Sequence, residues 1–248
     1  MKITPGILAI ENDPTPWLLI EPNDRKDFCV LWLQGWNATI KKHETILRQL
    51  AKQTNIAYAI LDYAGHGTHP ISLEQTTREQ QLNEALAAYD ALKARGYKHI
   101  IVAGTSFGGY LTALLSGKRD PFALVLRAAA IYPDDEFSMS YDERIARHSA
   151  YQKFKHTVTS ASNLTALRAI KNFQGSVYVV EHEIDSVIPK NILHAYFENA
   201  QRGNYLIIPA TDHALKRMPH PESHYAYVKG VISSIVTLAM LEKDIPKQ

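Results

Sequence analysis

The chain has 248 residues, of which 46% are apolar, and 27 basic side chains stand against 25 acidic ones, for a formal net charge of +2. A single cysteine, Cys29, excludes disulfide scaffolds and cysteine-rich metal modules, and its apolar surroundings predict a small buried side chain. Scattered charges and the lack of a run of about 18 apolar residues predict no nucleic-acid partner and no membrane span. No signal peptide is evident, so we expect a cytoplasmic protein.

The first half of the chain alternates short apolar runs with amphipathic stretches. Apolar runs typical of strands lie at residues 7–10, 17–20, 28–33, 56–61 and 99–104. Helical periodicity predicts helices at residues 41–53, 73–95 and 107–115. We expect the first two runs to form an antiparallel hairpin at a sheet edge. The later strands are separated by helices, so they should be parallel.

The second half continues the alternation after one long interruption. Strands are predicted at residues 122–130, 177–181 and 205–208, with helices at 190–200 and 224–241. Residues 133–173 are polar, tyrosine-rich and helix-like, and they are too many for a plain crossover. They predict a cap inserted into a single domain that spans residues 1–248. The tyrosines Tyr132, Tyr141 and Tyr151 either line a substrate cleft or anchor this cap to the core.

Residues 104–108 form a G-x-S-x-G motif centred on Ser106. The pattern alone is weak, but here it follows an apolar strand and opens a helix, which is the setting the motif requires. Small neighbours permit a sharp, strained turn around the serine. The turn holds the hydroxyl at the helix N-terminus, where free N–H groups and the helix dipole favour an anion. Ser106 is therefore the predicted nucleophile.

A serine hydroxyl needs a base to become a nucleophile at neutral pH. His213 directly follows the last predicted strand, so we expect it at the strand's carboxyl end, level with Ser106. Two other histidines lie beyond that strand: His220 stands between two prolines, and His224 is expected near the start of the terminal helix. His213 is the predicted base.

The base in turn needs an acid that orients it. In folds that carry the G-x-S-x-G turn, the three groups follow one another as serine, acid and histidine. The acid is therefore expected after the strand at residues 177–181, where residues 181–189 offer three carboxylates. Asp185 lies in the loop proper and is the predicted acid. Glu183, just past the strand, is the main alternative.

Five motifs in this order resemble those of the serine hydrolases with the α/β-hydrolase fold, in particular compact esterases and serine-aminopeptidase-like hydrolases. They lie at residues 33–37, 62–67, 104–109, 183–189 and 212–213. The resemblance implies an α/β fold with a mostly parallel central sheet, helices on both faces and a small cap. It also implies an oxyanion hole formed by the backbone N–H groups of Trp36 and Phe107.

Two residues of the first motif depart from the family pattern. Gln34 stands where the family most often has histidine, which alters the support of the loop but leaves its backbone donor. The large Trp36 either walls the acyl pocket, restricting it to small or flat groups, or packs in the core. The H-x-x-H sequence at residues 66–69 lacks the glutamate and the helix of a zinc protease, and no nucleotide-binding loop is present. We expect neither a metal nor a cofactor.

These residues predict an enzyme that cleaves an ester, preferably a carboxylic ester of a small acyl group, through an acyl-enzyme. An amide, peptide or thioester substrate would use the same groups, as would acyl transfer to an alcohol. A different class also remains open, namely a non-catalytic protein of the same fold that binds a small molecule or a protein partner. Such a protein would be expected to lack one of the three groups, and this chain has all of them.

Overall fold

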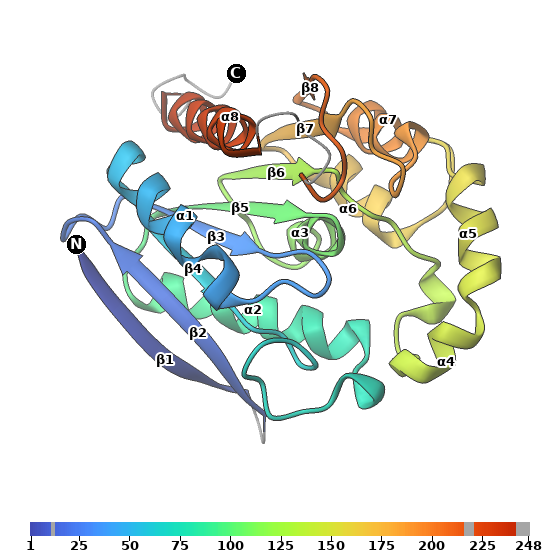
Figure 1. Ribbon diagram of the computed structural model, residues 1–248, viewed down its shortest axis with the longest axis horizontal. Coiled ribbons are helices and arrows are strands. Elements are labelled where there is room, and N and C mark those ends of the chain that lie inside the picture. Colours follow the sequence, from blue (N-terminus) through green and yellow to red (C-terminus); the bar gives the residue numbers. More distant parts are fainter. Residues whose placement is uncertain (11–12, 216–220, 242–248) are drawn as a thin grey trace.

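The computed structural model describes residues 1–10, 13–215 and 221–241, which contain one eight-stranded sheet (Figure 1). The strand order is β1-β2-β4-β3-β5-β6-β7-β8. The strands are β1 (Lys2–Ile10), β2 (Asp13–Glu21), β3 (Phe28–Leu33), β4 (Ala57–Leu61), β5 (His99–Thr105), β6 (Ala123–Arg127), β7 (Ser176–His182) and β8 (Gly203–Ile208). β1 and β2 form an antiparallel hairpin, β2 is antiparallel to β4, and all other neighbours are parallel. The predicted edge hairpin and parallel sheet are confirmed.

Helices cover both faces of the sheet, which explains why its central strands are continuously apolar (Figure 1). One face packs against α1 (Ile40–Thr54) and α8 (Pro221–Leu241). The other packs against α2 (Arg78–Ala94), α3 (Phe107–Ser116), α6 (Thr165–Asn172) and α7 (Lys190–Asn199). Within β3, Leu31 belongs to the core under α2 and α3, and Val30 to the core under α1 and α8. Cys29 is fully buried as predicted, and burial raises the pKa of its thiol.

Two predicted elements are shorter in the structure. The helix expected at residues 73–95 is a 3-10 turn at Leu73–Gln75 followed by α2, because the Thr77 hydroxyl accepts the N–H of Gln80 at 3.0 Å and starts the helix there. The strand expected at residues 122–130 ends at Arg127, where Ala128 turns to a positive φ of 43°. The chain after β6 thereby leaves the sheet and becomes available to the site.

The segment from residue 133 to 173 is helical and contains no strand, as its sequence predicts. After a 3-10 turn at Asp134–Glu136, α4 (Tyr141–Ala146) and α5 (His148–Thr157) lie beyond the carboxyl ends of the strands (Figure 1). The third helix, α6, instead packs against α3 and α7, with Leu167 and Ile170 in the core. The cap therefore stays a prediction, and α4 and α5 are the part of this segment that projects from the sheet (Figure 1).

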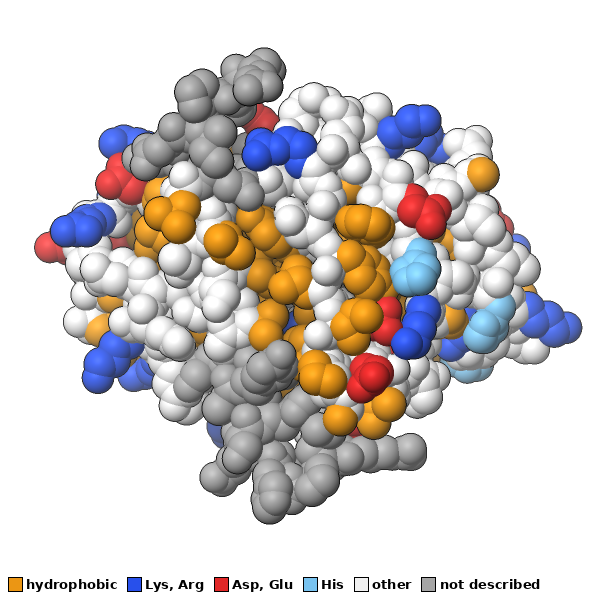
Figure 2. All heavy atoms as spheres, turned by 90° about the horizontal axis from the view of Figure 1, so that it is seen from above, with side chains coloured by type: hydrophobic (Ala, Val, Ile, Leu, Met, Phe, Trp, Pro, Cys, Tyr) orange, Lys and Arg blue, Asp and Glu red, His pale blue; other side chains and the backbone are white. Residues whose placement is uncertain are grey.

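A different face, formed by α7, α8 and β8, carries apolar side chains at its surface (Figure 2). They include Phe197 of α7, Ile207 of β8, and Leu238 and Leu241 of α8. No helix in the described part of the chain, α8 included, is long and apolar enough to cross a membrane.

Candidate active site

Ser106 lies in the turn between β5 and α3, with a backbone conformation of φ 53° and ψ −116°. This strained geometry is held by the backbone, because Ser106 N–H donates to Arg127 O at 3.0 Å and Ser106 O accepts from Ala130 N–H at 2.9 Å. Only glycine fits at position 108, where a Cβ atom would lie 1.9 Å from Leu33 O. The turn is therefore fixed by its close fit to β3 and to the chain after β6.

His213 lies in the loop after β8, and its Nε2 is 3.1 Å from Ser106 Oγ. The loop is attached to the end of β7, where His182 Nδ1 lies 3.0 Å from Asp212 O. Burial, with the charge of Arg127, lowers the pKa of His182 to about 3. The ring is therefore neutral, and its Nδ1–H donates to the carbonyl oxygen and holds the base loop against the sheet.

Asp185 completes the series from the loop after β7, with Oδ2 2.7 Å from His213 Nδ1. Its side chain is 3% exposed, and Oδ1 accepts the N–H groups of Val187 and Ile188 at 2.7 and 3.0 Å. Burial alone would raise the pKa of Asp185, but the bonds from His213 and the two N–H groups outweigh it and lower the pKa below its ordinary value. An ionised carboxylate only accepts, so Nδ1 of His213 carries the proton and Nε2 faces the Ser106 hydroxyl.

The alternative residues for these positions do not reach the same place. Glu183 is exposed and accepts the N–H of Ala210 at 2.6 Å, which supports the loop that carries His213. His220 lies outside the described residues, and His224 lies in the first turn of α8. The structure thus brings together the three side chains named from the sequence, Ser106, His213 and Asp185.

The loop after β3 brings Trp36 and its backbone against the same serine. A Cβ atom on Gly35 would lie 3.4 Å from Ser106 Cβ, so the two segments are in close contact. Asp62 fixes this loop, since its Oδ1 accepts from Gln34 Nε2 at 3.3 Å and from Ile40 N–H at 2.8 Å. Gln34 therefore supports the loop in place of the family's histidine.

The backbone N–H groups of Trp36 and Phe107, beside Ser106, have no acceptor within the described residues. Phe107 is the first residue of α3, where a helix leaves its N–H groups free. These are the two donors that the resemblance assigns to an oxyanion hole.

Ser106 and His213 line a cavity of about 800 Å³, and residues of α4 and α5 form the wall opposite them. Trp36 is half-buried at its edge, stacked on Tyr141 with ring centroids 5.4 Å apart, and edge-to-face with Phe107 at 5.5 Å. Tyr132 and Tyr151, stacked on each other at 5.1 Å, also line it. Trp36 is thus a wall of the cavity, and the tyrosines both line it and pack against one another.

Six charged side chains among the described residues line the cavity, and none was found from the sequence. Two are Lys42 of α1 and Arg127 of β6; the other four are Arg78, Glu136, Arg144 and Lys155. These four come from α2 and from the segment between β6 and α6, whose pattern shows helices but not which side chains turn inward. Charged residues in an amphipathic helix are ordinarily solvent-exposed, so no sequence signal separates these from their neighbours. Among the described residues, no cluster of three or more histidine, cysteine or acidic side chains could hold a metal ion.

Comparison of the sequence with known protein families shows which family the chain belongs to. The sequence model of the family described as serine aminopeptidase, S33, matches residues 24–177, more than half of the chain. The chain belongs to this family. The protein is therefore a serine hydrolase of the α/β-hydrolase type.

Solved structures with the same fold cover nearly the whole chain. Est1E from Butyrivibrio proteoclasticus with bound ferulic acid is 16% identical, with a TM-score of 0.72 over 95% of this chain and 99% of its own. A putative hydrolase from Agrobacterium vitis S4 is 18% identical, with a TM-score of 0.68 over 94% and 98%. Proline iminopeptidase from Mycobacterium smegmatis is 14% identical, with a TM-score of 0.68 over 97% and 100%. At these identities the likeness shows the α/β-hydrolase fold.

Proposed function

We propose that this hydrolase cleaves a carboxylic ester of a small acyl group, with Ser106, His213 and Asp185 as its catalytic triad. The observation that carries the proposal is the continuous series of contacts from Asp185 Oδ2 to His213 Nδ1 at 2.7 Å and from His213 Nε2 to Ser106 Oγ at 3.1 Å. His213 takes the serine proton as Oγ attacks the ester carbon, and then returns the proton to the leaving alcohol. Asp185 keeps the imidazole in the required tautomer and stabilises its charged form.

The oxyanion of the tetrahedral intermediate binds the N–H groups of Trp36 and Phe107. Both donors are free in the described residues, and the N-terminus of α3 adds a favourable dipole. The acyl-enzyme is then hydrolysed by a water that His213 deprotonates. The reaction needs no metal and no cofactor.

The residues that line the cavity favour an ester substrate over a peptide that is cleaved after its N-terminal residue. An aminopeptidase has to accommodate an α-ammonium group, which calls for a carboxylate or other acceptors in the substrate cleft. Glu136 is the one acidic residue among those that line the described cavity, and it is already paired with Arg78 at 3.1 Å. The wall formed by Trp36 and Tyr141 beside Phe107 supports a small or flat acyl group.

Labelling with a fluorophosphonate probe, together with turnover of para-nitrophenyl esters from acetate to octanoate, tests the proposal. Ser106→Ala should abolish labelling and lower kcat by about 10⁴-fold or more, because the oxygen that attacks the ester is removed. Ser116→Ala, at the other end of α3, is the matched control and should label and turn over normally. Labelling or turnover that survives Ser106→Ala contradicts the nucleophile, and equal turnover at every acyl length contradicts the small acyl group.

A further inference from the structure

The cavity is much more basic than the rest of the protein. The chain has a formal net charge of only +2. Yet five basic side chains line the cavity against the single carboxylate of Glu136: Lys42, Arg78, Arg127, Arg144 and Lys155. A pocket wall with one sign of charge and little water concentrates ligands of the opposite sign.

Two of these cations are already committed within the protein. Arg78 Nη1 pairs with Glu136 Oε2 at 3.1 Å, and its guanidinium lies 3.9 Å above the Tyr132 ring. Lys155 Nζ donates to Val187 O at 2.9 Å, in the loop that carries Asp185. Both side chains therefore have structural roles in the walls of the cavity.

Arg144 of α4 is 8% exposed and differs from both, because Nη1 is the one nitrogen of its guanidinium group with a hydrogen-bond partner among the described residues. The charge of Glu136 acts on Arg144, but that carboxylate is already paired with Arg78. Its Nη1 donates to Met139 O at 3.1 Å, but no carboxylate in the described part of the chain lies within ion-pair distance. Burial, with the nearby charge of Arg78, lowers the pKa of Arg144 to about 10, so the side chain is still cationic at neutral pH. A buried guanidinium without a counter-ion is costly, and a ligand anion would relieve that cost.

A series of aromatic contacts connects Arg144 with the proposed catalytic centre. Phe107, next to Ser106, contacts Trp36, and Trp36 stacks on Tyr141 with an interplanar angle of 14°. The Arg144 guanidinium lies 5.9 Å from the centre of the Tyr141 ring. These rings limit the acyl group beside Ser106, and a flat leaving alcohol that follows them beyond a small acyl group would point toward the cation of Arg144.

We propose that the substrate carries a carboxylate on its alcohol part and that Arg144 binds it. The inference rests on the proposed function, which assigns the acyl side to a small group and so leaves the charged group to the leaving alcohol. Arginine suits this task because its planar fork donates two parallel hydrogen bonds to a carboxylate. Arg144 is thereby a specificity-determining residue, and an acetylated hydroxybenzoate is a representative substrate.

The test compares release of acetate from meta-acetoxybenzoate and from its methyl ester, which has one added methyl group and no charge. With the wild-type enzyme, kcat/KM for the anion should exceed that for the methyl ester by about 10- to 100-fold, the range expected for one charged hydrogen-bonded pair. Arg144→Gln should bring this ratio close to one, and Arg144→Lys should retain part of it. Higher salt should lower the ratio for the wild type.

Arg147→Gln, at the C-terminal end of the same helix, provides the matched control. Arg147 directly follows α4 as its C-cap, is exposed and pairs with Asp135 at 2.7 Å, away from the cavity lining. Its substitution removes the same charge three residues further on and should leave the ratio unchanged. If the ratio falls equally in both variants, the loss of any positive charge in this region lowers it, and the specific role of Arg144 is overturned.

A binding measurement separates this inference from the proposed function. In Ser106→Ala, isothermal titration with intact meta-acetoxybenzoate should give an affinity about 10-fold or more above that of the methyl ester, and adding Arg144→Gln should remove the difference. If Ser106 is labelled and neutral esters are cleaved but the anion has no advantage, the inference fails and the proposed function stands. If labelling and hydrolysis both fail, the proposed function fails, and the binding ratio alone decides whether Arg144 selects a carboxylate.

Discussion

The two walls of the cavity are built in different ways. The wall at the carboxyl ends of the strands holds Ser106, His213 and the Trp36 loop, and the backbone fixes it through Ser106 N–H to Arg127 O and Ser106 O from Ala130 N–H. The opposite wall consists of α4 and α5, which lie beyond the carboxyl ends of the strands (Figure 1). Side chains such as Lys155, which donates to Val187 O, connect this wall with the first. Backbone contacts tolerate many sequences, whereas side-chain contacts change with each substitution. Chemistry is therefore expected to depend on the first wall, and choice of substrate on the second.

If the first wall carries the chemistry, the largest loss of kcat is expected on substitution of its acid, Asp185. Asp185→Asn should lower kcat by about 10³- to 10⁴-fold, because the amide no longer holds His213 in the tautomer that accepts the serine proton. Steady-state hydrolysis of para-nitrophenyl acetate measures the loss.

Glu183→Gln is the control for that experiment. Its carboxylate accepts the N–H of Ala210, and the glutamine carbonyl can accept the same bond, so kcat should change by less than about threefold. Equal losses of kcat in the two variants would contradict the assignment of Asp185 as the acid.

A smaller effect is expected where the second wall supports the first. Lys155 is buried in α5, donates to Val187 O, and Val187 N–H in turn donates to Asp185 Oδ1. Lys155→Met preserves the aliphatic volume but removes this support, so kcat should fall by about three- to tenfold as the acid loop loosens. Because the ammonium group is committed to a carbonyl, the loss should be the same for charged and neutral esters.

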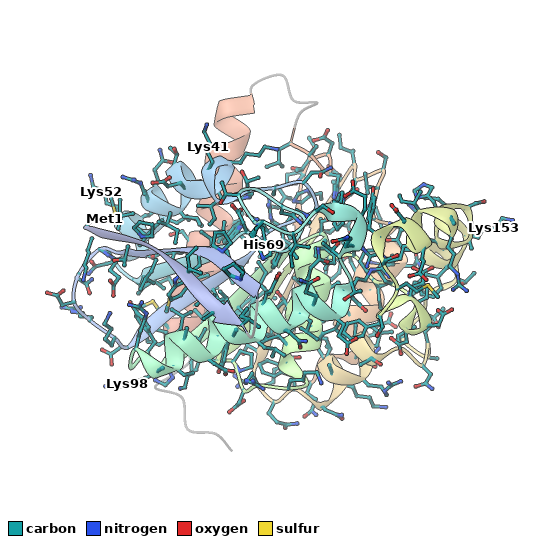
Figure 3. The ribbon with its side chains drawn as sticks, turned by 90° about the horizontal axis from the view of Figure 1, so that it is seen from below. Met1, Lys41, Lys52, His69, Lys98 and Lys153 are labelled. Atoms are coloured by element: carbon teal, nitrogen blue, oxygen red, sulfur yellow. The ribbon has the colours of Figure 1, made fainter. Side chains whose placement is uncertain are left out.

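Lys153→Met tests whether that effect is specific. Lys153 lies on the same helix two residues earlier and projects away from the body of the molecule (Figure 3). Its substitution should leave kcat as it is. A loss in Lys155→Met confined to anionic esters would show that this lysine selects substrate instead of holding the loop.

The last effect is on stability, not on turnover, and concerns the histidine that anchors the base loop. Burial lowers the pKa of His182 to about 3 from an ordinary value of 6.5. Between these values the unfolded chain binds a proton that the folded protein does not, so the free energy of unfolding should fall as the pH falls, by at most about 1.4 kcal/mol per pH unit. His182→Asn keeps a donor for Asp212 O and should make the pH dependence shallower between pH 6 and pH 4.

Urea unfolding at a series of pH values measures this slope. His156→Asn, which changes an exposed histidine of α5, is the control and should give the wild-type slope. The same slope in His182→Asn and in the wild type would mean that His182 is protonated in the folded protein.

The local sequence contained most of the fold and the three residues of the proposed triad. Buried parallel strands need continuous apolar runs, and the G-x-S-x-G turn needs glycine where Gly108 meets Leu33 O, so both leave a local signature. Element ends were less well predicted. The start of α2 depends on the cap formed by Thr77, and the end of β6 depends on contacts between Ala130 and Ser106.

The choice between competing residues required the tertiary structure. Asp185 and Glu183 lie two positions apart with the same charge, and only the path of the loop after β7 turns one toward His213 and the other toward Ala210. The same holds for Arg144 of α4 and Arg147 just after it, one buried in the cavity without an ion pair among the described residues and the other exposed beside Asp135. Sequence by itself determined which chemical groups follow which strands, because hydrogen-bonding and packing rules act locally. Only the packing of α4 and α5 decided which charges face the cavity, because that depends on contacts between segments far apart in the chain.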